Sequence, residues 1–516
     1  MPTRTSFIPH CTTLIFDIGD VLFSWSPDTP TRIPPKTLRG ITTSPTWGLY
    51  ERGQLSQDEC YHLIAQEYQF DVSDVAAAFQ HARDSLKPDD TFISFIRQLK
   101  AEMGTSLRVF AMSNISGPDY QVLRTKDADW SIFDHVFTSA AAGMRKPNLC
   151  FYRYVLEATG SDPRYTAFVD DKAENVLAAR SLGLHGIVFD KDTVFQTLRY
   201  LVCDPVRRGR AYLDAHAGRL ESVTDSGVTI EDNFAQLLIL EATNDQNLIN
   251  VRDCSQEGKW NFFKGKPALT TTDFPFDFDT TSIALTLIKH HPSTVRAVMD
   301  EMLRFLDEDG IIQTYFDHKR RRTDPVVCVN VLTLFHSQGR GSELSSTQAW
   351  VLDVLKNRAY LDGTRYYTSP DSFLYFLARL LKVTPDVSLR EALRPLLEER
   401  LRESIGAPGD ALALSMRIIA CSTLAARNEV DLRKLLPMQL EDGSWGPGNI
   451  YKYGSSGIGI GNCGLSTAVA LKAIQSLDSD QPVTGWKIWE GWARVSIFLC
   501  GLFIWLALMC VKCINV

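Results

Sequence analysis

The sequence lacks the cysteine patterns of disulfide-rich and zinc-finger proteins. Its 11 cysteines are scattered over 516 residues, and only Cys510 and Cys513 lie close together. Nowhere else does a pair show a CxxC or Cys/His spacing that would suit a zinc ion. Scattered, unpaired thiols are typical of a reducing compartment, so we expect reduced cysteines and a cytosolic protein.

The chain also has no excess of positive charge. Its formal net charge is −7, which argues against nucleic acid as a partner. The first twenty residues lack a basic region followed by a long apolar core and a cleavage site, so we expect no signal peptide there. Apolar residues make up 45% and charged residues 22% of the chain, which is ordinary globular composition. The length allows two domains and a tail.

Only the C-terminus contains a long uncharged run. Residues 495–511 carry no charge and would form roughly 25 Å of helix, the short end of a membrane span. Tryptophans and basic residues typical of a lipid headgroup boundary precede it: Trp486, Lys487, Trp489, Trp492 and Arg494. We predict a tail anchor at 495–511 after a linker at 478–494, with the preceding domains in the cytosol at the endoplasmic reticulum. The alternative is a buried C-terminal helix.

The first 200 residues have the pattern of a doubly wound α/β domain. Short apolar runs alternate with amphipathic segments, and the runs TTLIFDI, LRVFAMS, YTAFVD and HGIVF predict strands. Such alternation favours a parallel sheet. Residues 49–69 and 72–86 lie between the first two strands and have helical patterns, which predicts a helical cap. We place this domain at residues 1–204.

After residue 204 the pattern becomes helical. From Tyr212 to about Leu477 apolar positions recur mostly at helical spacing, which predicts an all-α domain over residues 205–477. It contains a loose repeat in which a Gly-bearing turn is followed about twenty residues later by a polar residue that opens an apolar helix. The pairs are EGKW with DTTSIAL, DGIIQTYF with NVLTLF, and DGSWG with LSTAVAL. This repeat predicts stacked helical hairpins in an α/α barrel.

Several polar residues of the α/β domain follow its predicted strands. Asp17 ends the first strand, in FDIGDVLF, where a side chain lies over the ligand-binding edge of such a sheet. Later segments carry the other members of the set: Ser113, Asn114, Lys146, Asp170 and Asp171. A nucleophilic carboxylate, a hydroxyl and a lysine for phosphate oxygens, and acidic magnesium ligands together predict attack on phosphorus.

With these motifs in this order, residues 10–195 resemble the haloacid dehalogenase superfamily, and YERGQLS in the cap adds to the likeness. The resemblance implies a Rossmann-like phosphatase domain in which Asp17 forms an aspartyl-phosphate. Ser113 and Lys146 would then bind the phosphoryl group. The implied cofactor is Mg²⁺, held by Asp17, the carbonyl of Gly19, and Asp171 with Asp170.

One position departs from the pattern of that superfamily. Its phosphatases usually carry a second Asp, the general acid, two residues after the nucleophile, and here that residue is Gly19. Asp20 is adjacent, but in an extended segment it would point to the opposite face. Without the acid, expulsion of an alkoxide is slow, whereas a phosphate leaving a diphosphate needs less protonation. We therefore expect a preference for an anhydride bond, or a weak phosphatase.

A second acidic motif opens an apolar helix of the helical domain. In FPFDFDTTSIAL, Asp277 and Asp279 are two residues apart and are followed by Thr280 and Thr281. An isolated motif of this kind is usually a helix N-cap. Here aromatic residues surround it and recur in the other repeat turns, where their π-faces could stabilise a carbocation. The aromatics are Trp260, Phe262, Phe263, Phe274, Phe276, Phe278, Tyr315, Phe316, Tyr366, Tyr367, Phe373, Tyr375, Phe376, Trp445, Tyr451 and Tyr453.

Protonation of an isolated alkene requires an acid kept protonated in a dry pocket, with its conjugate base stabilised by neighbours. We expect Asp277 and the hydroxyls of Thr280 and Thr281 to supply that support.

Residues 210–475 resemble class II terpene cyclases. The resemblance rests on the DxDTT motif and on QLEDGSWG, which is similar to the glutamine-tryptophan repeat of that family. It implies that Asp279 donates the proton and that Asp277 supports it. Thr280 in the fourth position, together with the domain order, is similar to drimane-type sesquiterpene synthases fused to a dehalogenase-like domain.

This resemblance implies protonation-initiated cyclisation of farnesyl diphosphate to a bicyclic diphosphate, followed by Mg²⁺-dependent dephosphorylation to the monophosphate or alcohol. Separate phosphatase or oxidase partners are possible. The alternative is a phosphatase for prenyl or lipid phosphates, in which the helical domain serves recognition only.

Two further patterns have competing interpretations. Asp170, Asp171 and Glu174 spell DDxxE, a magnesium motif of ionisation-initiated cyclases, but they follow a strand, so we assign the aspartates to the phosphatase. The basic run at 319–322 is more often a solvated face. Because it lies in a repeat turn, it could instead meet the substrate diphosphate.

Overall fold

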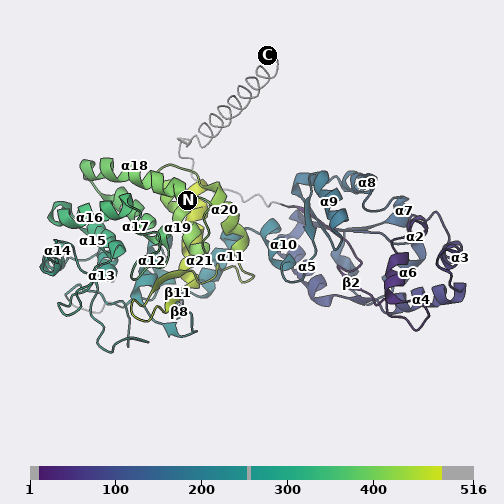
Figure 1. Ribbon diagram of the computed structural model, residues 1–516, viewed down its shortest axis with the longest axis horizontal. Helices are drawn as coiled ribbons and strands as arrows, with labels where there is room; N and C mark the ends of the chain where they lie inside the picture. Colours follow the sequence, from purple (N-terminus) through teal and green to yellow (C-terminus); the bar gives the residue numbers. More distant parts are fainter. Residues whose placement is uncertain (1–10, 253–256, 479–516) are drawn as a thin grey trace, which may run out of the picture. The chain divides into compact units, whose positions relative to one another are not determined.

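The computed structural model describes residues 11–252 and 257–478 (Figure 1). Internal contacts divide the chain into two units, one of residues 1–208 with 439–442 and one of 209–438 with 443–516. The predicted boundary between residues 204 and 205 falls at the start of helix α11 (Pro205–Ala215). The predicted membrane segment 495–511 lies outside the described residues. Within them, no helix is long and apolar enough to cross a membrane.

A parallel sheet forms the centre of the N-terminal unit. In the described residues its strand order is β5-β4-β1-β6-β7, and all neighbouring strands run parallel. β1 consists of apolar and threonine side chains that are all buried, as expected where helices cover both faces. The strands are β1 (Thr13–Phe16), β4 (Arg108–Ser113), β5 (His135–Thr138), β6 (Thr166–Asp170) and β7 (His185–Val188). The parallel α/β prediction is confirmed.

Helices pack on this sheet, and β2 and β3 form a separate two-stranded antiparallel sheet. The main apolar core includes Phe16, Phe92 and Leu198, which come from β1 and from two helices. These elements are β2 (Phe23–Ser24), β3 (Lys87–Pro88), α5 (Asp90–Met103), α6 (Gly117–Arg124), α7 (Ser139–Ala142), α8 (Leu149–Thr159), α9 (Ala173–Ser181) and α10 (Val194–Val202).

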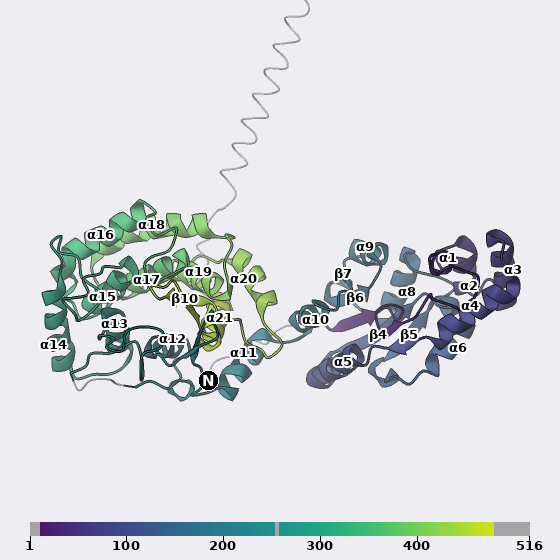
Figure 2. The ribbon, with the colours of Figure 1, turned by 60° about the horizontal axis from the view of Figure 1, so that its bottom comes forward.

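The predicted helical cap is present and has its own apolar core (Figure 2). Trp47 stacks on Phe79, with ring centroids 4.2 Å apart. The helix predicted at 49–69 is divided in two, because Gly53 takes a left-handed turn with φ of 70°. The cap helices are α1 (Pro35–Ile41), α2 (Pro45–Glu51), α3 (Gln57–Tyr68) and α4 (Val72–Asp84).

A closed ring of helices forms the centre of the C-terminal unit. Within its described part, α12, α13, α15, α17, α19 and α21 contact one another in sequence, and α21 returns to contact α12. Figure 2 shows α14, α16, α18 and α20 outside them. The inner helices are α12 (Asn233–Thr243), α13 (Phe278–Leu287), α15 (Pro325–Ser337), α17 (Pro370–Val383), α19 (Ala411–Thr423) and α21 (Cys463–Asp478). The outer helices are α14 (Pro292–Met302), α16 (Ser345–Lys356), α18 (Val387–Ser404) and α20 (Glu429–Leu435).

The repeat seen in the sequence lies near the starts of inner helices, but its polar residues do not open them: Asp279 is the second residue of α13, and Asn330 lies inside α15. Each inner helix is preceded by a short polar side chain that accepts a backbone N–H of the first turn, which satisfies donors left open at a helix end. These residues are Asp232, Asp277, Asp324, Ser369, Asp410 and Asn462. A small antiparallel sheet completes the unit. Its strands are β8 (Ser222–Thr224), β9 (Thr229–Ile230), β10 (Asn449–Lys452) and β11 (Gly459–Gly461).

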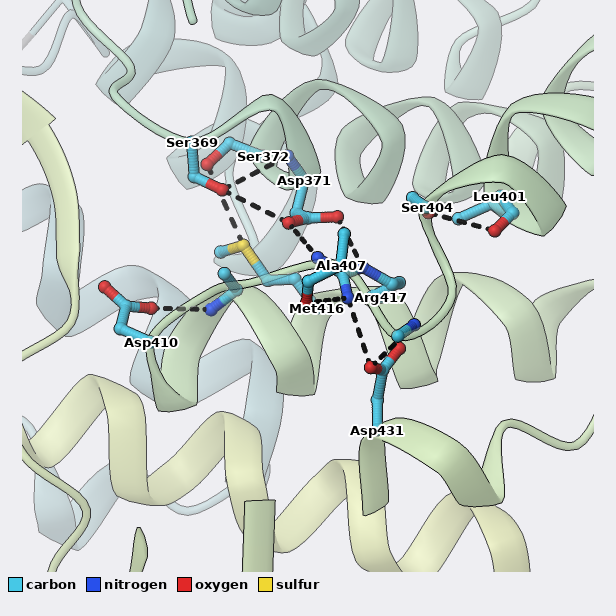
Figure 3. A network of polar contacts seen from close by, with 12 residues as sticks. Ser369, Asp371, Ser372, Leu401, Ser404, Ala407, Asp410, Met416, Arg417 and Asp431 are labelled. Atoms are coloured by element: carbon cyan, nitrogen blue, oxygen red, sulfur yellow. Dashed lines mark hydrogen bonds and ion pairs between the residues drawn. The ribbon is translucent and has the colours of Figure 1, made fainter. Parts of the chain in front are cut away.

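A buried ion-pair network ties α17, α19 and α20 together (Figure 3). Both Nε and Nη2 of Arg417 donate to the carboxylate of Asp371, at 2.9 and 2.8 Å. Nη1 of Arg417 donates to Asp431 at 3.2 Å, and Asn428 donates to the other Asp431 oxygen at 2.6 Å. Since every charge here meets a partner, the network fixes these helices without an isolated buried charge.

Candidate functional sites: a phosphate cavity and an acidic aromatic cavity

Asp17 lies at the end of β1 among charged groups from two other segments. Its Oδ1 is 2.8 Å from Nζ of Lys146, and the same Nζ lies 2.6 Å from Oδ2 of Asp170. The backbone N–H of Ile18 also donates to Oδ1 of Asp17, at 2.7 Å. Lys146 is buried and holds two carboxylates, which agrees with the predicted meeting of these residues at one sheet edge.

The side chain of Asn114 binds the backbone of Lys146. The amide oxygen of Asn114 accepts the N–H of Lys146 at 2.8 Å, and its NH₂ group donates to the Lys146 carbonyl at 2.9 Å. Ser113, the other residue predicted from that segment, lines the same cavity as Asp17. Asn175, which sequence reasoning missed, donates to Oδ1 of Asp170 at 2.9 Å. The ends of β1, β4 and β6 and the loop that carries Lys146 therefore bring the predicted residues together, and Asn175 of α9 adds a further contact.

Three carboxylates form a cluster that suits a hard cation. Ligand atoms of Asp17, Asp170 and Asp171 all lie within 4.8 Å of one another. Oxygen donors of this kind fit Mg²⁺. Of the adjacent pair, Asp171 lines the cavity, whereas Asp170 binds Lys146 and Asn175. Glu174, the third residue of the DDxxE pattern, is exposed and outside the cluster.

Burial sets the charge balance of this cluster. Desolvation raises the pKa of Asp17, Lys146 lowers it, and the charge of Asp170 raises it further. Desolvation and the charge of Asp170 also raise the pKa of Asp171. A bound cation would favour the ionised form of both groups.

The prediction for Asp20 was wrong. Asp20 adopts the left-handed region with φ of 55°, so the alternation of an extended strand stops there. Its side chain lines the same cavity as Asp17, and Oδ2 lies 3.9 Å from Nη1 of Arg39. At Gly19 an added Cβ would meet no atom within 4 Å, and φ is not positive. Packing therefore does not require glycine at position 19.

The cavity lined by Asp17, Ser113 and Lys146 has a volume of about 330 Å³, and both charged and apolar residues line it. Charged groups lie beside the sheet, and apolar side chains form other parts of its wall. These apolar residues are Ile18, Phe23, Trp25, Trp47, Leu86, Ile115 and Leu123. Arg39 lies over the ring of Trp25 at 5.1 Å. A phosphate ester with a hydrocarbon group matches this combination of surfaces.

In the C-terminal unit, Asp277 and Asp279 have different positions. Asp277 is the N-cap of α13, and its Oδ1 accepts the N–H of Thr280 at 2.6 Å. The capping interpretation therefore holds for Asp277. Asp279 lies two residues further along the chain, as the second residue of α13. Both carboxylates line one cavity.

Two uncharged side chains donate hydrogen bonds to Asp279. The hydroxyl of Tyr367 donates to Oδ2, and the amide of Asn330 donates to Oδ1 at 2.6 Å. The expected support from threonine hydroxyls was wrong. Thr281 donates to the carbonyl of Trp260 at 3.2 Å, which fixes the loop before the motif, and Thr280 contributes its backbone to Asp277.

Burial makes both motif carboxylates weak acids. Desolvation raises the pKa of Asp279 to about 7, against the opposing effect of the Tyr367 and Asn330 hydrogen bonds. The nearby charges of Asp277 and Asp324 raise it as well. Desolvation also raises the pKa of Asp277 to about 7. Two carboxyl groups with pKa values near 7 in an aromatic-lined cavity are suited to proton transfer.

The cavity around Asp279 is aromatic and has a volume of about 100 Å³. Its aromatic lining is Phe234, Phe262, Phe274, Tyr315, Tyr366, Tyr367, Tyr451 and Tyr453. All but Phe234 were among the predicted candidates. Other candidates belong to the packed interior: Trp260 and Trp445 are almost fully buried, and Trp445 donates to the carbonyl of Leu435 at 2.9 Å. The aromatic prediction is therefore confirmed for part of the set.

Basic side chains also line this cavity. They are Arg320 and Arg322 from the basic run and Lys452 from β10. Lys319 and Arg321 of the same run are not in the lining, and the Arg321 side chain is 70% exposed. Cationic groups beside an aromatic space suit a ligand with an apolar chain and an anionic end.

Comparison with known proteins identifies the chain. It is 48% identical over 464 residues to the drimenol cyclase drtB of Aspergillus calidoustus, covering 89% of this chain and 87% of that protein. The chain belongs to the drimane-type sesquiterpene synthases. Residues 206–338 also match the family model of the sesquiterpene cyclase astC-like C-terminal domain.

The N-terminal unit of this synthase has relatives of its own. It is 41% identical over 196 residues to the sesquiterpene phosphatase astK of Aspergillus oryzae, covering 37% of this chain and 98% of that protein. A solved HAD-like hydrolase from Porphyromonas gingivalis covers 37% of this chain and 98% of its own, with 21% identity and a TM-score of 0.31. The match to astK shows that the synthase combines a phosphatase-type domain with a cyclase domain.

Sequence reasoning did not connect Asp279 with its two hydrogen-bond donors. Tyr367 and Asn330 are 88 and 51 residues away from it along the chain. Tyr367 was expected only as an aromatic lining residue, and Asn330 only as the first residue of the repeat segment NVLTLF. Lys452 and Phe234 likewise line the cavity around Asp279 only because the inner helices close into a ring. For Tyr367, its place just before an inner helix, in the YY pair of a repeat turn, was the available indication.

Proposed function

We propose that this synthase cyclises farnesyl diphosphate to a drimane-type bicyclic diphosphate and then removes phosphate from that product. The observation that carries the proposal is Asp279. It is a buried carboxyl with a pKa raised to about 7, its side-chain hydrogen-bond donors among the described residues are the uncharged Tyr367 and Asn330, and it lines an aromatic cavity.

In the proposed cyclisation, Asp279 gives its proton to the terminal double bond of the substrate. The resulting cation is attacked by the next double bond, and a second attack closes the second ring. The bicyclic cation then gives a proton to solvent, which balances the proton taken from Asp279. The C–O bond to the diphosphate is not broken, so the diphosphate stays attached and the net change is an isomerisation. Tyr367 and Asn330 stabilise the Asp279 carboxylate as it forms, and aromatic faces stabilise the cation.

The basic side chains of the lining would bind the substrate diphosphate. Arg320, Arg322 and Lys452 share the cavity with Asp279. Arg320 also donates to Thr271 and to the carbonyl of Asp273, so its guanidinium is already held in place. Anchoring one end of the substrate would orient its distal double bond toward the acid.

For the second step we propose that Asp17 attacks the terminal phosphorus. The bond from that phosphorus to the bridging oxygen breaks, so the monophosphate leaves and water then hydrolyses the aspartyl-phosphate. Lys146 and Ser113 would bind the phosphoryl oxygens. Mg²⁺, held by Asp17, Asp170, Asp171 and the carbonyl of Gly19, would neutralise charge on the phosphate. Because Gly19 supplies no acid, the first phosphate should leave faster than the second.

Incubation of the purified full chain with farnesyl diphosphate and Mg²⁺ tests this proposal. We expect a bicyclic product as monophosphate or alcohol, and the same carbon skeleton after treatment with an added phosphatase. A chelator should block phosphate release at the bicyclic diphosphate. Linear farnesol as the sole product would instead support a phosphatase whose helical domain serves recognition.

We also propose that residues 495–511 anchor the chain in the endoplasmic reticulum membrane. The uncharged run and its flanking tryptophans and basic residues support this proposal. Carbonate extraction of cells expressing the full chain, compared with a chain ending at residue 478, tests it. The full chain should stay in the membrane fraction and the shortened chain should not.

A further inference from the structure

Asp279, Asn330, Arg379 and Glu241 form a continuous polar chain across four inner helices. Asn330 on α15 donates through Nδ2 to Oδ1 of Asp279 at 2.6 Å. Its Oδ1 accepts from Nη1 of Arg379 on α17 at 3.2 Å. Nε of Arg379 donates to Oε1 of Glu241 on α12 at 2.6 Å. This series of hydrogen bonds therefore begins at Asp279, the proposed proton donor, and ends at the carboxylate of Glu241 on the far side of Arg379.

This arrangement gives the Asn330 amide one orientation. An amide has an acceptor oxygen and a donor nitrogen, which can exchange places by a flip. Arg379 has donors but no acceptor, so the oxygen of Asn330 must face it. The NH₂ group then faces Asp279. A flipped amide would present an oxygen to a carboxylate that is losing its proton, which is repulsive.

Arg379 is itself held in place. Glu241 pairs with it, and the side chains are only 12% and 16% exposed. The guanidinium also lies over the ring of Phe376 at 5.9 Å. Because Glu241 balances its charge, Arg379 can lie near Asp279 without leaving an uncompensated buried charge.

We propose that Arg379, fixed by Glu241, is a positioning residue for proton transfer: it locks the Asn330 amide so that its NH₂ stabilises the Asp279 carboxylate as the proton leaves. The proposal rests on the proposed role of Asp279. It adds a residue that touches neither substrate nor proton but sets the strength of the acid.

Several groups act on the charge of Asp279 at once. Asp277 and Asp324 disfavour the carboxylate, and Tyr367 and Asn330 stabilise it by hydrogen bonds. The positive charge of Arg379 is near enough to interact with Asp279, and so is the Cys328 thiol. Loss of Arg379 removes a positive charge and loosens a donor, so the acid becomes weaker and holds its proton to higher pH.

None of Asn330, Arg379 and Glu241 is among the residues lining the described aromatic cavity. A change at Arg379 should therefore alter kcat rather than KM. This separation distinguishes a positioning role from substrate binding.

The test compares two variants of the full chain, with kcat, KM and the pH profile of farnesyl diphosphate cyclisation as readouts. The double variant Arg379→Met with Glu241→Gln removes the donor without leaving a lone carboxylate. We expect kcat to fall about tenfold to hundredfold with KM within about twofold, and the alkaline limb to move to higher pH. Arg379→Lys keeps a charged donor and should recover much of kcat.

A matched control removes a buried arginine together with its carboxylate partners elsewhere. Arg417→Met with Asp371→Asn and Asp431→Asn does so in the network of Figure 3, in which none of the hydrogen bonds described reaches Asp279. Per folded molecule its kcat should stay within about threefold, with an unmoved alkaline limb. An equal kcat loss and limb shift in this control would overturn the proposal, as would a wild-type profile in the Arg379 double variant.

Two further variants keep the result interpretable. If the double variant does not fold, Glu241→Gln alone is measured. This variant leaves the charge of Arg379 unbalanced, so the alkaline limb should move to lower pH. An unmoved limb would contradict the proposal.

Asp279→Asn distinguishes failure of the positioning role from failure of the proposed function. If it still cyclises, the proposed function fails. If it is inactive while Arg379 variants behave as wild type, only the positioning role fails.

Discussion

Asp279 and Asp371 occupy the same position, the second residue of their inner helices, but differ in the charge of their partners. Asp371 binds the guanidinium of Arg417 through both oxygens, at 2.9 and 2.8 Å. Asp279 instead receives hydrogen bonds from the uncharged Tyr367 and Asn330. A guanidinium favours the carboxylate, whereas burial with uncharged donors leaves the protonated acid populated near neutral pH. One fold position thus serves structure in α17 and, in the proposed function, proton donation in α13.

The raised pKa of Asp279 predicts a pH dependence for cyclisation. Its pKa is about 7, so the acid is protonated below that value and its protonated fraction falls about tenfold per pH unit above it. Asp277 has a similar pKa, so the observed limb belongs to the pair. Single-turnover cyclisation in an Asp17→Asn background should be constant at acidic pH and decline above about 7. A rate that rises from pH 6 to pH 9 would contradict this role.

Tyr367→Phe should weaken proton transfer without removing the aromatic wall. The variant loses the hydroxyl that donates to Asp279, and we expect kcat to fall about a hundredfold, as for loss of a donor to a developing anion. The alkaline limb should move to higher pH, because the carboxylate loses a stabilising bond. Tyr360→Phe is the control, since Tyr360 is buried against Phe373 outside the cavity lining. Equal losses in both variants would count against the assignment.

Arg322 and Arg321 allow a matched test of diphosphate binding. Arg322 lines the cavity, whereas its neighbour Arg321 is exposed. Arg322→Gln should raise KM for farnesyl diphosphate about tenfold or more, the loss expected for a charged hydrogen bond. Arg321→Gln should change it little, because exposed charges are screened by salt. If both variants raise KM alike, the basic run acts only through its overall charge.

Gly19→Asp should strengthen the phosphatase toward monophosphates. A Cβ at position 19 meets no atom within 4 Å and the backbone is not left-handed, so the site can accept the side chain. An acid there could protonate the leaving alkoxide, and we expect at least about a tenfold faster release of the second phosphate. Gly19→Asn controls for bulk without acidity. An equal effect of both substitutions would show that protonation of the leaving group does not limit the rate.

Much of the α/β domain could be predicted because its strands are continuous apolar runs. The four predicted strands correspond to β1, β4, β6 and β7. β5 was missed because its sequence, HVFT, contains only two consecutive apolar residues. The site around Asp17 could also be predicted from the sequence, since parallel strands bring Asp17, Ser113 and Asp170 to one edge of the sheet.

The helical site could be predicted only in part. The motif identifies Asp277 and Asp279 because they are only two residues apart in the sequence, but the groups that change the pKa of Asp279 come from other inner helices and turns. Whether Asn330, Tyr367 or Arg379 reaches it depends on how the inner helices close, a long-range property that local periodicity does not encode. The same limit explains the wrong expectation for Thr281, whose hydroxyl binds the Trp260 loop instead.

We propose that one chain catalyses two separate chemical steps at two separate sites. Product analysis of Asp17→Asn and Asp279→Asn tests this most directly, with each variant first incubated alone and then both together, always with farnesyl diphosphate and Mg²⁺. Asp17→Asn should accumulate the bicyclic diphosphate, Asp279→Asn should form no bicyclic product, and the mixture should restore dephosphorylated bicyclic product. Bicyclic product from Asp279→Asn, or phosphate release by Asp17→Asn at the wild-type rate, would contradict the account.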